Sequence, residues 1–260
     1  MRVLPVFGSL IACLTLAATV CADEATHAGS HGADPTGEPS DWAMSHMMGN
    51  EPYAMLLVDR LEYGDGDHGD SFLWDLQGWY GGDYNKLWLK SEGEGPAGEA
   101  VDTAEFQALY SRLFTPFWSW QAGARYDARH GESDVGYAVL GLQGLAPQRF
   151  ETDVALFVSD DGDVSLRGEF EYDLLLTQRL VLQPRLELGV SAQSAPDLGI
   201  GSGVTHSELG LRLRYEIRRE FAPYLGIHWE RLYGDTRDYA AQAGEPTSIT
   251  SFVIGLRAWL

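Results

Sequence analysis

From about Tyr53 to Leu260 the chain repeats segments of about ten residues in which apolar and polar side chains alternate. Between Leu209 and Ile217 every second residue is Leu, Tyr or Ile, and the intervening positions are mainly Arg and Glu. Period-two alternation places these two sets on opposite faces of a strand. Because Arg and Glu avoid lipid, the pattern predicts strands with a lipid-facing apolar side and a polar side that lines a lumen.

The connections between these segments alternate between two length classes. The short ones are 81–83, 115–116, 146–148, 177–178 and 219–223, and the long ones are 64–70, 91–102, 127–134, 159–163, 191–205 and 233–248. Outer-membrane barrels have tight turns at the periplasmic rim and longer loops at the external rim. We therefore predict an all-β, antiparallel, up-and-down outer-membrane barrel of twelve strands. Ten strands remain an alternative if 53–63 or 104–114 is irregular, because the faces of these segments are the least cleanly divided.

The N-terminal region has a different character from the barrel. Residues 1–22 combine a basic start, an apolar run over 3–19 and small residues before Asp23, which predicts a signal peptide for export. Residues 23–51 are rich in Gly, Pro, Ser, Asp and His and lack apolar periodicity, so we expect a disordered periplasmic arm. The predicted domains are therefore the signal peptide 1–22, the arm 23–51 and the barrel 52–260.

Cysteine content and charge narrow the function classes. Cys13 and Cys21 both lie in the predicted signal peptide, so the mature chain has neither disulfides nor thiolate metal sites. A lipoprotein acylated at Cys21 is the alternative, which the bulk of Val20 disfavours. The formal net charge of −20 argues against nucleic acid as a partner, because phosphate binding requires Lys and Arg. The acidic loops suit solubility or divalent ions at the cell surface.

The inward positions carry both signs of charge. Sixteen of the eighteen basic residues are Arg, whose forked guanidinium suits pairing with carboxylates in a confined space. This predicts a lumen of modest diameter that is closed by ion pairs, and it argues against a wide, unselective porin.

The candidate metal ligands cluster just before the barrel. They are Met44, His46, Met47, Met48 and Met55, with His27 and His31 further upstream. Thioether and imidazole donors together suit copper, and thioethers select the cuprous ion. In an extended arm Met44, His46 and Met48 project on one side. The alternative is that these methionines only plug the periplasmic mouth of the barrel as flexible apolar side chains.

Two other groups of polar residues are candidate sites. Twelve-stranded outer-membrane phospholipases use a serine and a histidine on one strand, but neighbouring strand residues such as His206 and Ser207 point to opposite faces. We therefore predict that the protein is not an enzyme. The acidic segment 65–70 lacks the full ligand run and the distal Glu of a calcium loop, which favours a solvated turn.

Several barrel segments resemble the copper-resistance protein B family. The similar segments are Asp59–Tyr63, Trp74–Lys90, Glu171–Leu180, Gln183–Leu188, Gly199–Gly203 and Leu211–Tyr224. The resemblance implies an outer-membrane protein of periplasmic copper tolerance, often encoded beside a periplasmic multicopper oxidase. Many relatives carry a much longer Met/His-rich N-terminal region. The single compact cluster in this chain favours transfer or gating over high-capacity sequestration.

Together these observations predict an outer-membrane copper-binding protein that confers resistance by sequestering periplasmic copper or passing it outward. The expected ligand is a copper ion, with Cu(I) favoured, and the expected partners are outer-membrane lipid and a periplasmic multicopper oxidase. The alternative is a general small-solute channel in which the arm is a plug.

Overall fold

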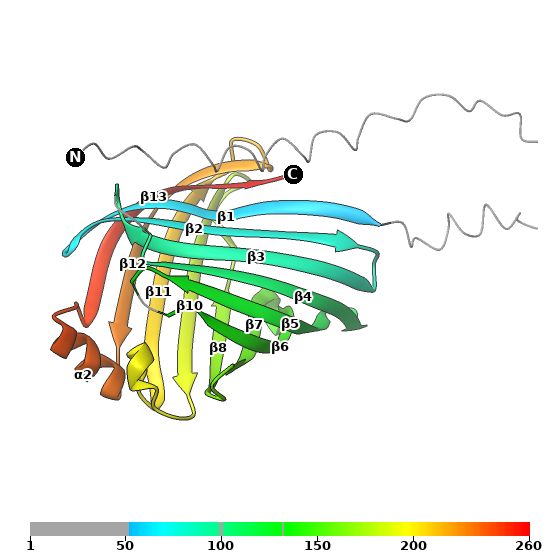
Figure 1. Ribbon diagram of the computed structural model, residues 1–260. Coiled ribbons are helices and arrows are strands. Elements are labelled where there is room, and N and C mark those ends of the chain that lie inside the picture. Colours follow the sequence, from blue (N-terminus) through cyan, green and yellow to red (C-terminus); the bar gives the residue numbers. More distant parts are fainter. Residues whose placement is uncertain (1–51, 99–100, 132) are drawn as a thin grey trace, which may run out of the picture. The chain divides into compact units, whose positions relative to one another are not determined.

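The computed structural model describes residues 52–98, 101–131 and 133–260. These residues form an antiparallel sheet that closes into a barrel, because β13 pairs with β1 and β10 pairs with β11 (Figure 1). Within this part of the chain, no helix has both the length and the apolar character needed to cross a membrane. The predicted signal peptide and arm, with every predicted ligand except Met55, lie outside the described residues.

Twelve strands close the barrel, as the alternation predicts, and one short extra strand lies beside β10. The strands are β1 Tyr53–Gly66, β2 Gly69–Gly81, β3 Asn85–Pro96, β4 Thr103–Thr115, β5 Trp118–Arg129, β6 Val135–Ala146, β7 Phe150–Ser159, β8 Val164–Glu171, β9 Leu174–Leu175, β10 Leu180–Ser191, β11 Gly203–Tyr215, β12 Phe221–Leu232 and β13 Ser248–Trp259. The helical segments are η2 Pro147–Arg149, η3 Pro196–Leu198 and α2 Gly234–Ala243. The ten-strand alternative is wrong, because β1 and β4 each run through 13 or more residues.

The two rims of the barrel differ as expected. The first strand begins and the last strand ends at the same rim, which we call the terminal rim. There the backbone of Leu56 is hydrogen-bonded to that of Leu260. Its connections are 82–84, 116–117, 147–149, 176–179 and 216–220. We call the opposite rim the loop rim, and its connections are 67–68, 97–102, 130–134, 160–163, 192–202 and 233–247.

One predicted long connection is wrong. Gly66 pairs with Gly69, so β1 and β2 are joined by a two-residue turn instead of a loop over 64–70. The turn forms because Gly69 adopts a φ of +116°, which favours glycine. The Gly- and Asp-rich residues on either side continue the strands.

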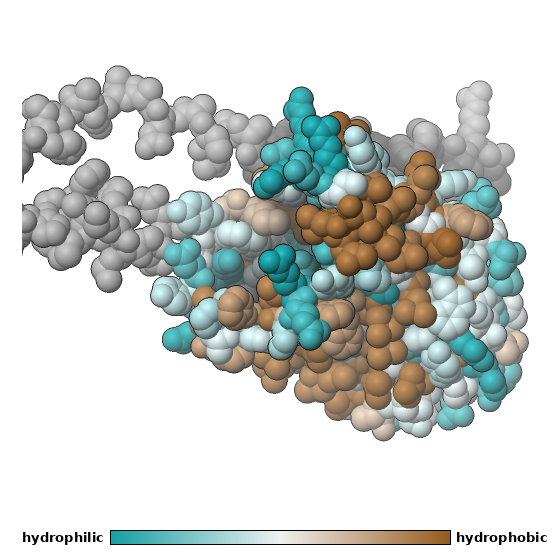
Figure 2. Space-filling view, turned by 180° about the vertical axis from the view of Figure 1, so that it is seen from behind, coloured by the Kyte–Doolittle hydropathy of each residue, from teal (hydrophilic) through white to brown (hydrophobic). Residues whose placement is uncertain are grey.

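The two faces of the sheet have opposite chemistry. Large apolar side chains such as Leu209 and Leu211 are 47% and 45% exposed on the outer surface. Figure 2 shows such hydrophobic residues gathered in a broad patch on one side of the barrel. Conversely, 18 polar or charged residues but only nine apolar ones are buried among the described residues. This inversion relative to a water-soluble domain is typical of a transmembrane β-barrel of the outer-membrane type.

Candidate functional site

A β-bulge in β1 turns two consecutive charged residues into the lumen. Val58 pairs with Leu76, whereas Arg60 pairs with Asp75, so Asp59 is the extra residue of the bulge. Both Asp59 and Arg60 are buried. Strict alternation would have directed one of these two charges toward lipid.

Each charge of the bulge meets an opposite charge on another strand. Asp59 Oδ1 lies 2.9 Å from Arg257 Nε on β13. Arg60 Nη2 lies 3.1 Å from Asp75 Oδ2 on β2, and it also contacts Glu92 on β3. The bulge therefore links three neighbouring strands through the lumen.

Further ion pairs lie in the lumen, as the Arg-rich composition predicts. Arg167 Nη2 on β8 lies 3.1 Å from Glu105 Oε2 on β4, four strands away in the strand order. Arg185 Nη2 on β10 lies 2.9 Å from Glu169 on the adjacent β8 and 3.0 Å from Glu187 on β10 itself. Groups so enclosed are stable only when paired, and these pairs narrow the lumen.

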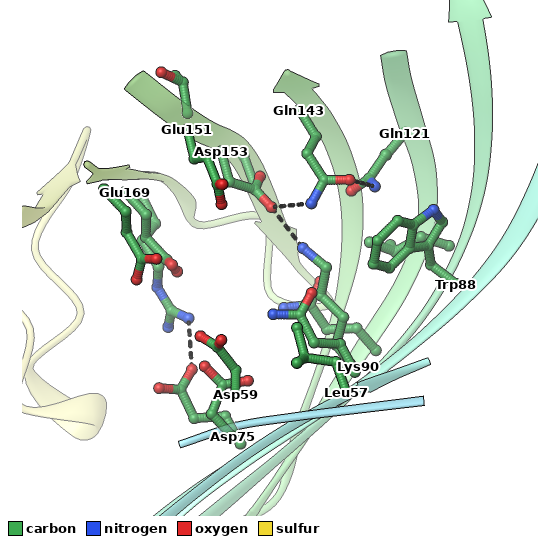
Figure 3. A pocket seen from close by; sticks show the side chains of 18 of the residues that line it. Leu57, Asp59, Asp75, Trp88, Lys90, Gln121, Gln143, Glu151, Asp153 and Glu169 are labelled. Atoms are coloured by element: carbon green, nitrogen blue, oxygen red, sulfur yellow. Dashed lines mark hydrogen bonds and ion pairs between the residues drawn. The ribbon is translucent and has the colours of Figure 1, made fainter. Parts of the chain in front are cut away.

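A cavity of about 420 Å³ remains in the lumen between these pairs. Its charged walls are formed by Asp59, Asp75, Glu92, Glu105, Glu151, Asp153, Glu169 and Glu171, against Lys90, Arg167 and Arg257. In Figure 3 the Lys90 ammonium points at Asp153, at a distance of 2.6 Å. Arg60, Arg125 and Arg185 do not line the cavity but pair with five of its carboxylates. The eight carboxylates still outnumber these three arginines and the three cations of the wall together, and this excess of negative charge attracts cations.

Met55 on β1 also lines this cavity. It is the one predicted copper ligand within the described residues, and its strand position faces Trp79 on β2 near the terminal rim. Met44, His46, Met47, Met48, His27 and His31 lie outside the described residues, so their arrangement around a metal stays a prediction.

Sequence reasoning missed a second group of metal-type donors, nearer the loop rim. Glu187 on β10 and His206 and Glu208 on β11 bring one ligand atom each to within 4.8 Å of one another. Glu187 and Glu208 are directly opposite each other in the β10–β11 register. The spacing of His206 and Glu208, two residues apart on one strand, could have revealed this group, because period two directs both side chains inward.

The geometry around His206 also bears on the hydrolase alternative. The hydroxyl of Ser207 lies 2.9 Å from the hydroxyl of Tyr233, whereas His206 Nδ1 lies 3.0 Å from Thr205 Oγ1. His206 and Ser207 therefore have different partners and are not hydrogen-bonded to each other as base and nucleophile.

Comparison with known proteins identifies a family and a fold. The family model described as "Copper resistance protein B precursor (CopB)" matches residues 52–260. Copper resistance protein B of Escherichia coli is 45% identical over 205 residues, which are 79% of this chain and 69% of that protein. A homolog from Pseudomonas syringae pv. tomato is 44% identical over 204 residues, covering 78% of this chain and 69% of that protein.

Among solved structures, the NanC porin matches 78% of this chain and 98% of its own, with a TM-score of 0.50 and 14% sequence identity. At this identity the likeness shows a shared porin-like barrel fold and nothing about solutes.

Proposed function

Because this chain belongs to the copper resistance protein B family, we propose that it supports copper resistance by binding periplasmic copper and passing it outward through the lumen of an outer-membrane barrel. The observation that carries the proposal is the excess of carboxylates on the cavity wall. The family and the barrel fold suggest a non-catalytic protein, so the function is binding and transfer.

The acidic lumen supports a path for cations. A lumen bounded by low-dielectric walls focuses the field of its charges and raises the local concentration of ions of opposite sign. At an effective dielectric constant of about 20, one unpaired carboxylate attracts a monovalent cation 4 Å away by about 4 kcal/mol. The same field repels anions, so the lumen suits copper ions better than anionic solutes.

The capture step is assigned to the segment that precedes the barrel. In the proposal, residues 23–51 form the periplasmic arm after removal of the signal peptide 1–22. Met44, His46, Met47 and Met48 bind the cuprous ion there, assisted by His27 and His31, because thioethers select Cu(I). Met55 offers the next thioether on the cavity wall. Met55 follows Met48 by seven positions, so the two lie within about 25 Å of each other even in a fully extended chain.

A single compact cluster suits capture and transfer better than storage of many ions. The family resemblance further suggests a periplasmic multicopper oxidase as a partner at the terminal rim. The apolar outer surface suits contact with outer-membrane lipid.

Anaerobic titration with cuprous ion against a competing chelator tests the capture step. The mature protein is compared with the same barrel lacking residues 23–51 and with the Met44→Ala/His46→Ala/Met47→Ala/Met48→Ala variant. We expect both changes to abolish tight binding, and we expect the quadruple variant to raise the copper sensitivity of cells while barrel assembly is unchanged. Unchanged binding and equal copper tolerance would remove the segment from the proposal.

A general small-solute channel is the competing function. It predicts that uncharged solutes pass at rates similar to copper, with residues 23–51 serving only as a plug. The ion pairs Arg167–Glu105 and Arg60–Asp75 disfavour it, because they occupy space that a sugar-sized solute requires.

A further inference from the structure

We propose that Glu187, His206 and Glu208 form a separate lumenal site for a single cupric ion, nearer the loop rim than the cavity. The inference rests on the proposed copper function and deepens it by adding a site for the oxidised ion. The three donors come from adjacent strands and lie within 4.8 Å of one another. Metal–ligand distances of about 2.0–2.2 Å place donors about 3–4 Å apart, so small side-chain movements complete the site.

The imidazole of His206 is oriented for ligation. Its Nδ1 lies 3.0 Å from Thr205 Oγ1, and which of the two atoms donates depends on the tautomer. Without a metal, Nε2–H faces Glu187 Oε1 at 3.5 Å. A metal ion would replace that proton on Nε2, and Nδ1–H would then donate to the Thr205 hydroxyl oxygen. Metal-bound histidines usually fix the ring by a hydrogen bond from the other nitrogen in this way.

Glycine at position 189 makes room for this ring. Gly189 is directly opposite His206 in the β10–β11 register. A methyl group on Gly189 would occupy the position of the imidazole carbon and nitrogen atoms. The ring therefore reaches the two carboxylates only because residue 189 has no side chain.

The two carboxylates of the group differ in how far arginines compensate their charge: Glu187 has two arginines nearby, whereas Glu208 has one at the limit of ion-pair distance. Glu187 uses Oε2 for a 3.0 Å hydrogen bond from Arg185, and its Oε1 faces His206 with Arg167 Nε 3.4 Å away. Glu208 has one cation within ion-pair range, Arg185 at 4.0 Å, in the described part of the chain. A metal ion near His206 would balance the remaining charge.

Two more acidic residues surround the site. Glu230 on β12 is directly opposite Glu208, and Glu94 on β3 interacts electrostatically with both. Neither Glu94 nor Glu230 forms an ion pair with another residue that the structure describes. Such a concentration of negative charge inside a barrel favours a multivalent cation over a monovalent one.

The donor types point to copper in its divalent state. One imidazole and two carboxylates form a nitrogen–oxygen site, and at such sites Cu²⁺ binds more tightly than the other divalent first-row ions. The three donors are one imidazole and two carboxylates, in contrast to the methionine-rich segment that suits Cu(I). The positive charges of Arg167 and Arg185 weaken binding, which suits an ion in transit.

Electron paramagnetic resonance and equilibrium dialysis of the full mature protein with Cu²⁺ test the site. The five histidines outside the lumen are first removed by His27→Ala, His31→Ala, His46→Ala, His68→Ala and His130→Ala, so that nitrogen coupling reports on the lumen. We expect one bound Cu²⁺ with coupling to a single imidazole nitrogen. His206→Gln should abolish that signal, and Glu208→Gln and Gly189→Ala should each weaken binding at least about tenfold.

His228→Gln is the matched control, because His228 on β12 faces the same lumen but is not a member of the group. We expect the Cu²⁺ signal of this variant to be unchanged. Retained nitrogen coupling in His206→Gln, or equal loss in His228→Gln, would overturn the assignment. Circular dichroism confirms that each variant remains a barrel. This measurement detects Cu²⁺ in the lumen, whereas the chelator titration detects Cu(I) bound by residues 23–51. Either site can therefore prove absent while the other is present.

Discussion

Among single residues, Glu62 shows how a charged side chain is buried in the lumen: its carboxylate is paired with an arginine and accepts a further hydrogen bond. Arg212 Nη2 on β11 donates to Glu62 Oε2 at 3.1 Å, and the Tyr224 hydroxyl on β12 donates to Oε1 at 2.9 Å. Both Glu62 and Arg212 are almost inaccessible to solvent, at 4% and 3%. The carboxylate therefore connects β1 to two strands beyond β13, its direct neighbour.

This arrangement predicts the effect of removing the carboxylate. Glu62→Ala leaves the Arg212 charge enclosed without a partner, so the free energy of unfolding should fall by about 3–5 kcal/mol. Tyr224→Phe removes one hydrogen bond and should cost about 1 kcal/mol. Guanidinium unfolding in lipid vesicles measures both. A loss below about 1 kcal/mol in Glu62→Ala would contradict the role given to this pair.

The residues of β11 and β1 also show which lumen-facing positions could be predicted from the sequence and which could not. The two-residue period correctly predicted which side of β11 faces the lumen, because Leu209, Leu211 and Leu213 alternate there with polar or small residues. It could not resolve β1, where the bulge at Asp59 places two consecutive charges inward. The pairing of Glu62 with Arg212 could not be predicted from the sequence either, because the two residues are 150 positions apart and meet only when the barrel closes.

At the scale of elements, two connections of the loop rim dock on each other. The amide of Gly201, three residues after η3, donates to Thr236 Oγ1 of α2 at 2.8 Å. A side chain at Gly201 would collide with the backbone of α2. The length of this connection was predicted, but α2 was not, because its ten residues carry no clear apolar stripe.

This docking predicts a local change when the hydroxyl is removed. Thr236→Val should lose about 0.5–1.5 kcal/mol of local stability and speed amide hydrogen exchange in 196–202. Asp238→Asn is the control on the same helix, because its pair with Arg237 is solvent-exposed and contributes little. Equal exchange in both variants would show that the Gly201–Thr236 bond does not hold the two connections together.

For the whole molecule, the fold could be predicted from the sequence more fully than the candidate sites. The strand number, the two classes of rim and the Arg-rich lumen follow from local patterns. The cavity and the Glu187–His206–Glu208 group do not, because each depends on strand curvature, register and the exact partner of every Arg. The Met/His segment is a local pattern too, but it lies outside the described residues and stays a prediction.

The central claim is that lumenal negative charge carries copper through the barrel. Three carboxylates allow a clean test, because Glu94, Glu151 and Glu230 form no ion pairs with other residues in the described ranges. Their replacement by Gln therefore lowers the charge without breaking an Arg–carboxylate pair. Asp238→Asn/Glu245→Gln, in the connection that follows β12, removes exposed charge outside the lumen as a control.

The most direct measurement is the rate of cuprous uptake into proteoliposomes that contain a trapped chelator, under anaerobic conditions. We predict rapid uptake by the wild-type and control proteins, and uptake at least about tenfold slower in the Glu94→Gln/Glu151→Gln/Glu230→Gln variant. Equal rates in all three proteins, or a wild-type rate no higher than that of empty vesicles, would contradict it.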